Sequence, residues 1–153
     1  MSTDIQICYV DVVTATSTEA KNRVGLRRFE NGREYIYQQA DDAITAGQAV
    51  KLDIAASADG LKVTPCAAAG DSCFGVAEVA IADESYGWIT VRGVATVSVA
   101  NGVAVDDPLA ASGAAGVLAD VAETGSGDMK FVRAVALEAN ASGSAAAKKV
   151  YLL

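Results

Sequence analysis

Histidine is absent from this chain of 153 residues, and its absence limits the chemistry that the sequence can support. Most catalytic sites need a group that titrates near neutral pH, and histidine is the usual one. Without it, Ser-His-Asp and Cys-His triads and most catalytic zinc sites are excluded. We therefore expect no enzymatic activity. The alternative that stays open is an enzyme using a cysteine or a carboxylate pair.

Two pairs of adjacent carboxylates, Asp41-Asp42 and Asp106-Asp107, are the first candidates for such chemistry. Adjacent side chains on a strand point to opposite faces, and in a turn they usually accept hydrogen bonds from backbone amides. We expect a structural role in turns, with calcium binding or acid–base catalysis as the alternative. The acidic segment 123–128, ETGSGD, predicts a solvated loop because its spacing matches no metal-ligand pattern. We expect no metal and no cofactor.

The cysteines and glycines carry no recognisable site. Cys8, Cys66 and Cys73 are odd in number, and their spacing matches neither C-x-x-C nor a zinc pattern. We expect buried thiols, with a Cys66–Cys73 disulfide as the alternative. The glycine pairs 113/116 and 125/127 are not placed between a strand and a helix, so neither predicts a phosphate-binding loop.

The charge and hydropathy of the chain exclude other classes of partner. The net charge is −7, whereas nucleic-acid-binding proteins usually show a basic stripe. No apolar run reaches the ~18–20 residues that span a bilayer. The first residues, MSTDIQICYV, lack the basic start of a signal peptide. We expect no nucleic-acid or membrane partner, and synthesis in a cytoplasm.

Apolar and polar residues alternate over residues 88–99, WITVRGVATVSV. One face is entirely apolar and the other mostly polar, which predicts a strand with one buried face. The strand is long, and Gly93 near its middle predicts a bulge or bend at a barrel corner. Asn101-Gly102 then predicts a hairpin turn.

Strand signals recur every ~8–14 residues with turn residues between them, which is typical of a small all-β protein. Two short segments, 40–46 and 82–86, could each form one helical turn. Residues 145–149 could also be helical, but Gly143 and the valine-rich end of the chain favour a strand there. We predict an all-β fold, a small barrel or sandwich of short antiparallel strands. The further strands are expected at 24–30, 33–39, 49–53, 61–66, 74–81, 103–105, 117–121, 129–137 and 149–153.

The first 22 residues differ from the rest. Ile5–Val13 could form a strand, and residues 14–22 are a polar, Ser/Thr-rich linker. We therefore predict an N-terminal arm and linker at 1–22, followed by a single β-rich body at 23–153. The arm would rest on the body or on a neighbouring subunit.

Basic and aromatic residues near the arm are candidates for protein contacts. Arg27-Arg28, with Arg23 and Arg33 nearby, could form surface salt bridges or anchor acidic residues of a partner, since arginine is enriched at interfaces. Tyr35 and Tyr37 share one face of a strand, and Trp88 begins another. These aromatic residues could pack in the core, or could join Arg92 in a subunit interface.

Several segments stand in an order that resembles the small head-decoration, or capsid cement, proteins of tailed bacteriophages. The resemblance covers roughly residues 33–153. It departs from the family pattern at Val132, where glycine is expected, and the first ~30 residues have no counterpart that we can place. The segments are AITAGQAVKLD (43–53), FGVAEVAIADESYGWITVRGVATV (74–97), NGVAVDDPLAASGAAGVL (101–118), RAVALEANASG (133–143) and KKVYLL (148–153).

The resemblance implies a protein made in the host cytoplasm that binds the outer surface of a phage head. It would bridge neighbouring subunits of the major capsid protein, as a homotrimer, and stabilise the expanded head against internal DNA pressure. The alternative is another virion surface module: a head fibre base, a tail component or a glycan- or receptor-binding adhesion domain. The expected capsid contacts are Ile5, Gln6, Ile7, Tyr9, Arg27 and Arg28.

Overall fold

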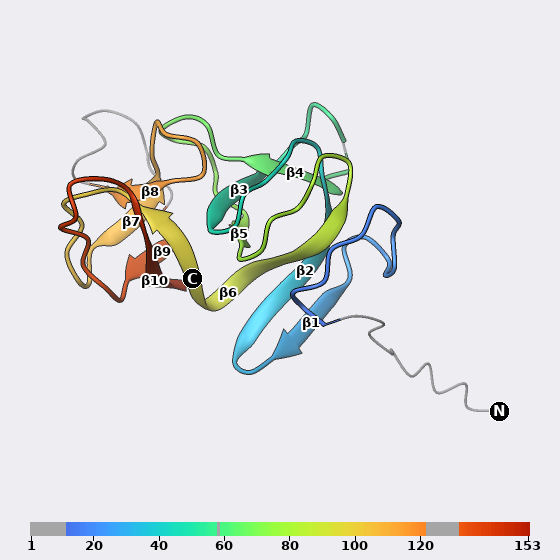
Figure 1. Ribbon diagram of the computed structural model, residues 1–153, viewed down its shortest axis with the longest axis horizontal. Coiled ribbons are helices and arrows are strands. Elements are labelled where there is room, and N and C mark those ends of the chain that lie inside the picture. Colours follow the sequence, from blue (N-terminus) through green and yellow to red (C-terminus); the bar gives the residue numbers. More distant parts are fainter. Residues whose placement is uncertain (1–11, 58, 122–131) are drawn as a thin grey trace.

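The computed structural model describes residues 12–57, 59–121 and 132–153, and within these ranges all regular structure is β-strand (Figure 1). No helix in the described ranges is long and apolar enough to cross a membrane. The all-β prediction is confirmed. The strands are β1 (Arg27–Glu30), β2 (Arg33–Ala40), β3 (Gln48–Leu52), β4 (Lys62–Pro65), β5 (Gly75–Ala77), β6 (Tyr86–Val99), β7 (Pro108–Ala111), β8 (Leu118–Asp120), β9 (Ala134–Ala136) and β10 (Ala146–Leu152).

Strand β6 belongs to two rings of strands. Its first half closes the ring β2–β4–β3–β5–β6, which we call the N-terminal barrel, through its pairings with β2 and β5. Its second half closes the ring β6–β10–β9–β7–β8, which we call the C-terminal barrel. The expected antiparallel pairing holds except for β2–β4 and β6–β8, which are parallel and close the two rings.

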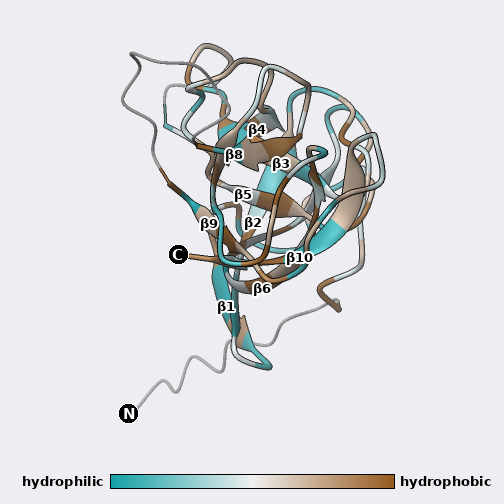
Figure 2. Ribbon diagram, turned by 90° about the vertical axis from the view of Figure 1, so that its left-hand side faces the viewer, coloured by the Kyte–Doolittle hydropathy of each residue, from teal (hydrophilic) through white to brown (hydrophobic). Residues whose placement is uncertain are grey.

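One face of β6 supplies both cores. Ile89 and Val91 belong to the buried cluster of the N-terminal barrel, whereas Ala95, Val97 and Val99 belong to that of the C-terminal barrel. The predicted apolar face is therefore confirmed along its whole length. In Figure 2, hydrophobic colour is concentrated on the barrel strands, while β1 projects below them and is mostly hydrophilic.

Gly93 lies where β6 passes from one barrel to the other, and its φ is +92°. A Cβ atom there would lie 2.7 Å from the carbonyl oxygen of Gly32, which is backbone and cannot swing away. The register between β2 and β6 also shifts nearby, between Glu34 and Tyr35. The expected bend is confirmed, and glycine is required by both the backbone angle and the close approach.

Glu78 joins the two halves of β6 across this bend. Its carboxylate accepts hydrogen bonds from the Thr90 hydroxyl and from the Thr96 amide, each at 3.1 Å. It also pairs with the Arg33 guanidinium at 3.0 Å. A single carboxylate therefore contacts β6 on both sides of Gly93 and the start of β2.

Several expected elements differ in the structure. Residues 103–105 form no strand, because the Asp107 carboxylate accepts the Ala104 amide at 2.7 Å and holds a turn. The strand begins instead at Pro108, since proline tolerates the first position of a strand although it cannot donate there. Asn101-Gly102 does turn the chain, but β6 and β7 do not pair with each other.

The two segments considered as helical turns form other structures: residues 40–46 and 82–86 consist of strand ends, turns, bends and isolated bridges. The strand favoured for residues 145–149 is confirmed, since β10 begins at Ala146. The Asn31-Gly32 hairpin between β1 and β2 is confirmed, with φ values of 50° and 74°. The part of the expected strand at 129–131 lies outside the described residues.

The described part of the predicted arm, residues 12–22, packs on the body. Ser17 pairs with Tyr86 in an isolated β-bridge, and the Lys21 amide donates to the Tyr37 hydroxyl at 3.2 Å. Val13 packs against the aromatic cluster on β2 and β6. The described part of the arm therefore rests on the body, which is one of the two alternatives expected for it. Residues 1–11 lie outside the described residues, and the boundary at residue 22 stays a prediction.

Replacing Gly93 by alanine should lower the free energy of unfolding by about 1–3 kcal/mol, because it imposes a positive φ on a side chain and a clash with backbone. Urea unfolding of the wild-type and variant proteins measures the difference. Gly113→Ala is the matched control, since a Cβ atom there meets nothing within 4 Å. Equal stability losses in the two variants would show that the bend does not depend on glycine.

A chain beginning at residue 23 should be less stable than one beginning at residue 12 by about 1 kcal/mol, because it loses the packing of the half-buried Val13 side chain. The shorter chain also uncovers Trp88, the single tryptophan of the protein. Its fluorescence emission should therefore move to longer wavelength. Identical emission and stability in the two chains would contradict the packing of residues 12–22 on the cluster.

Candidate protein-interaction surface

The aromatic residues considered for a subunit interface are buried inside the chain. Tyr35, Tyr37 and Trp88 are only 5%, 2% and 2% exposed. The Tyr37 ring meets Trp88 edge-on at 5.1 Å and stacks on Tyr86 at 6.1 Å between ring centroids. These three rings thus fit the core alternative, because burial leaves them almost no surface for a partner. Of the four candidate interface residues, Arg92 alone is exposed.

Both candidate arginines of β1 are held within the chain. Arg27 pairs with Glu34, and Arg28 pairs with Glu30 at 2.6 Å. The Arg28 guanidinium also lies 5.8 Å from the centre of the Trp88 ring, within the range of a cation–π contact. Of the two roles considered for these arginines, salt bridges within the protein and anchoring of a partner, the structure shows the salt bridges. The other expected capsid contacts, Ile5, Gln6, Ile7 and Tyr9, lie outside the described residues.

The acidic pairs take structural roles. Asp41 accepts the Lys62 ammonium at 2.9 Å, and Asp42 accepts the Thr64 hydroxyl at 3.0 Å. Lys62 also pairs with Glu84, and the hydrogen bonds from Lys62 to Glu84 and Asp41 raise its pKa. Across the described residues, no three His, Cys, Asp or Glu side chains are grouped to hold a metal ion. Residues 123–128, which were expected to form a solvated loop, lie outside the described residues.

Cys66 and Cys73 are free and buried, so the disulfide alternative is not formed in this structure. A hydrogen bond with Cys73, together with burial, raises the pKa of the Cys66 thiol. Both effects disfavour the reactive thiolate. Cys8 lies outside the described residues.

A concave surface, which we call the trough, runs between the two barrels. It consists of three adjoining hollows of about 460, 230 and 430 Å³. Phe74 and Arg133 line both the first and the second, and Glu34 and Arg92 line both the second and the third. Each hollow takes its walls from both barrels or from the β1–β2 hairpin and the C-terminal barrel, so the trough exists only because the barrels are joined.

The trough gathers much of the exposed apolar surface of the protein. Eight large hydrophobic side chains are exposed among the described residues, and five of them line the trough. Phe29 is 72% exposed at the β1–β2 hairpin, and Leu153 is 50% exposed beside β6. Clustered exposed hydrophobic residues mark interaction sites more reliably than scattered ones. The five are Phe29, Ile54, Val132, Tyr151 and Leu153.

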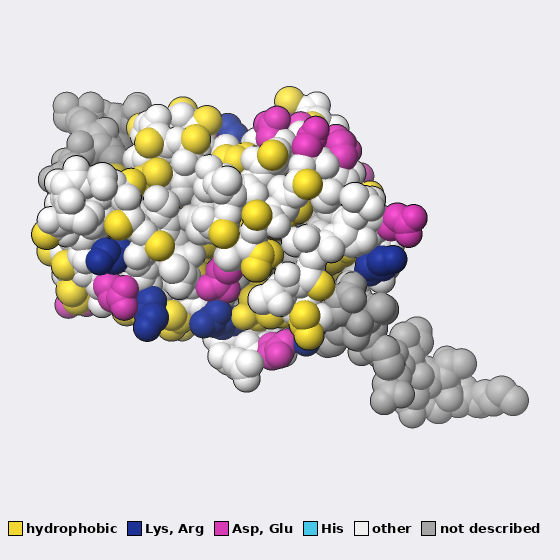
Figure 3. All heavy atoms as spheres, in the orientation of Figure 1, with side chains coloured by type: hydrophobic (Ala, Val, Ile, Leu, Met, Phe, Trp, Pro, Cys, Tyr) yellow, Lys and Arg dark blue, Asp and Glu magenta, His cyan; other side chains and the backbone are white. Residues whose placement is uncertain are grey.

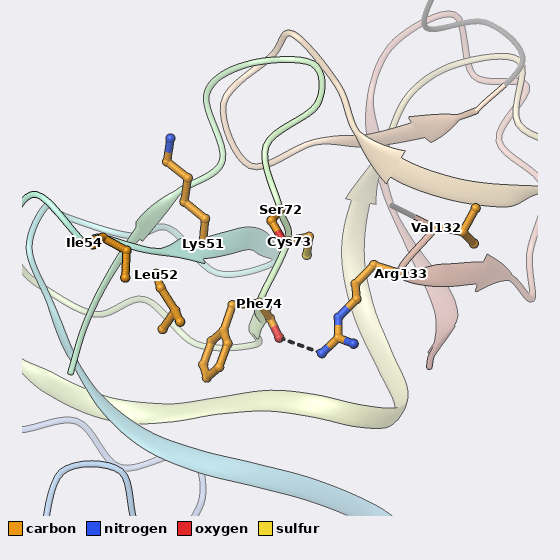
Figure 4. A pocket seen from close by; sticks show the side chains of 8 residues that line it. All are labelled: Lys51, Leu52, Ile54, Ser72, Cys73, Phe74, Val132 and Arg133. Atoms are coloured by element: carbon orange, nitrogen blue, oxygen red, sulfur yellow. Dashed lines mark hydrogen bonds between the residues drawn. The ribbon is translucent and has the colours of Figure 1, made fainter. Parts of the chain in front are cut away.

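Two arginines of the trough have no carboxylate partner among the described residues: Arg92 and Arg133. The Arg133 guanidinium donates instead to the Phe74 carbonyl at 3.3 Å, reaching from the C-terminal barrel to the N-terminal barrel (Figure 4). In Figure 3, Asp and Glu side chains gather at the upper right, while the Lys and Arg side chains in view lie mostly along the lower edge beside hydrophobic ones.

Sequence reasoning identified Arg92 but missed Arg133 and Phe74 as parts of the same surface. Arg133 drew attention only within the family-like segment RAVALEANASG. It reaches Phe74 across 59 positions of sequence, a contact that no local pattern reports. An arginine that follows the apolar Val132 just before a strand is the local pattern that could have indicated this surface.

Comparison with known proteins yields one informative likeness. No protein-family description matches the chain, and no curated protein does either. Among solved structures, the fold is similar to the head fiber gp8.5 N base of bacteriophage phi29. The TM-score is 0.57 at 13% sequence identity, over 78% of this chain and 92% of that chain. At this identity the likeness shows a shared fold.

The two described thiols should react slowly in the folded protein, because both are buried and the pKa of Cys66 is raised. In a Cys8→Ser variant, an aromatic disulfide reagent at pH 8 should label neither thiol quickly, and urea should release both. Rapid labelling of one thiol in the folded protein would instead favour a reactive cysteine.

Proposed function

We propose that this protein is a structural component of a tailed-phage head that binds the outer capsid surface and acts by contact rather than catalysis. The observation that carries the proposal is the fold shared with the phi29 head fiber base. The order of the decoration-protein-like segments supports it independently, because that order is a property of the sequence and not of the fold. The absence of histidine agrees with a role in binding.

We further propose that the protein bridges neighbouring subunits of the major capsid protein as a homotrimer. A protein that binds only the assembled shell raises the free energy needed to separate its subunits. Three linked copies on one three-fold site would gain roughly 10²–10⁴-fold in avidity without any new contact. If the site forms only on the expanded shell, binding selects that state.

A second candidate function is the base of a head fibre, and it is favoured because the structural neighbour is itself a head fiber base. A fibre base attaches to the head through one surface and carries an appendage on another. It need not bridge capsid subunits, so it need not strengthen the shell. The two candidates therefore differ in what attachment does to the head.

Purified protein should sediment with expanded heads of the phage that encodes it and should raise the temperature at which those heads release DNA. Unexpanded heads should bind less. Attachment without any gain in head stability would favour the fibre base, and failure to sediment with either form of head would contradict both candidates. A chain beginning at residue 12 tests the arm, since weaker sedimentation is expected if Ile5, Gln6, Ile7 and Tyr9 contact the capsid.

A further inference from the structure

We propose that the trough binds a segment of another protein that presents a carboxylate beside a large apolar side chain. Arg92 and Arg133 would hold the carboxylate, and the apolar group would pack against Phe74 and Leu153. All four side chains line the second hollow. Only the identity of the partner, an acidic segment of a head protein, rests on the proposed function.

The other cations around the trough are paired with carboxylates. Arg27, Arg33 and Lys51 each have a carboxylate partner, with nitrogen–oxygen distances of 3.0 Å for the last two. Arg92 and Arg133 line the second hollow, and neither forms a salt bridge with a described residue, because the Glu34 carboxylate that lines the same hollow is paired with Arg27. In a chain of net charge −7, two such cations on one hollow favour an anionic partner.

Arg133 is already positioned for such a partner. Its guanidinium donates to the Phe74 carbonyl at 3.3 Å, and this contact fixes the side chain across the gap between the barrels. A guanidinium carries five N–H donors and can hold a carboxylate with two parallel hydrogen bonds. One contact within the protein therefore leaves donors for a ligand.

The apolar walls determine the second half of the ligand. Leu52, Ile54, Phe74 and Val132 line the first hollow of about 460 Å³, and Figure 4 shows Leu52 and Phe74 near the centre of this region with Arg133 facing them. A free inorganic anion would leave these side chains in water. A peptide with an apolar residue next to an acidic one covers both kinds of surface, as interfaces with an apolar centre and a polar rim do.

The test uses the full-length protein and two short peptides. Acetyl-Leu-Asp-Phe-Glu-Leu-amide is the acidic probe, and its Asn/Gln counterpart is the neutral control of the same shape. Nuclear magnetic resonance follows the arginine side-chain N–H signals during titration. The N–H signals of Arg92 and Arg133 should shift, and the shifts should saturate, with the acidic peptide only. Arg23, which is exposed and has no carboxylate partner among the described residues, is the internal control.

Matched variants separate binding from folding. The double variant Arg92→Gln, Arg133→Gln should bind the acidic peptide with an affinity at least about tenfold lower, as expected for loss of charge-assisted hydrogen bonds. Arg23→Gln should bind as the wild type does. Arg133→Lys keeps the charge but loses the bidentate geometry of the guanidinium. Its affinity for the acidic peptide should therefore lie between those of the wild type and the double variant. Thermal unfolding confirms that each variant is folded.

Three results would overturn the proposal: equal shifts with both peptides, shifts of Arg23 as large as those of Arg92, or unchanged affinity in the folded double variant. Sedimentation with heads tests the partner separately. If the double variant loses the peptide but still binds heads fully, the trough is a docking site for a different partner. If the wild type binds the peptide and no heads, the proposed function fails and the docking site stands.

Discussion

Strand β6 serves two barrels because its backbone turns at Gly93, where φ is +92° and the carbonyl of Gly32 leaves no room for a side chain. Every other large feature depends on this turn. The same apolar face fills the N-terminal core before the bend and the C-terminal core after it. Glu78 supports the bend through Thr90 and Thr96. The shared strand and a buried cluster that includes Ala49 and Val76 of the N-terminal barrel hold the two barrels together.

The bend also accounts for the trough. A straight β6 would not bring the residues before β9 close to the loop that carries Phe74. With the bend, Arg133 reaches Phe74, and the C-terminal residue Leu153 lies against the wall formed by Val91 and Arg92. A binding surface built from two barrels is as rigid as their junction. A partner could therefore bind with little loss of conformational freedom in this protein.

The outer face of the N-terminal barrel differs from the trough because its large side chains are covered. Its aromatic residues are covered by the chain itself, through Val13, Val24 and Leu26. The residues that looked most like interface anchors are thereby used for folding, and the apolar surface left exposed is concentrated in the trough.

The all-β class, the buried face of β6, the bend at Gly93 and the Asn31-Gly32 hairpin could all be predicted from the sequence. Each of these is encoded locally, by a two-residue period or by a residue that tolerates positive φ. The sequence also excluded histidine-based catalysis.

Three features are visible in the tertiary structure alone. The strands close into two rings, and the Tyr35, Tyr37 and Trp88 side chains are covered. Arg92 and Arg133 line one hollow. Parallel closure by β4 and β8, and the contact between Arg133 and Phe74, join residues far apart in the chain. Such contacts depend on the path of the whole backbone, and a local alternation of apolar and polar residues carries no information about that path.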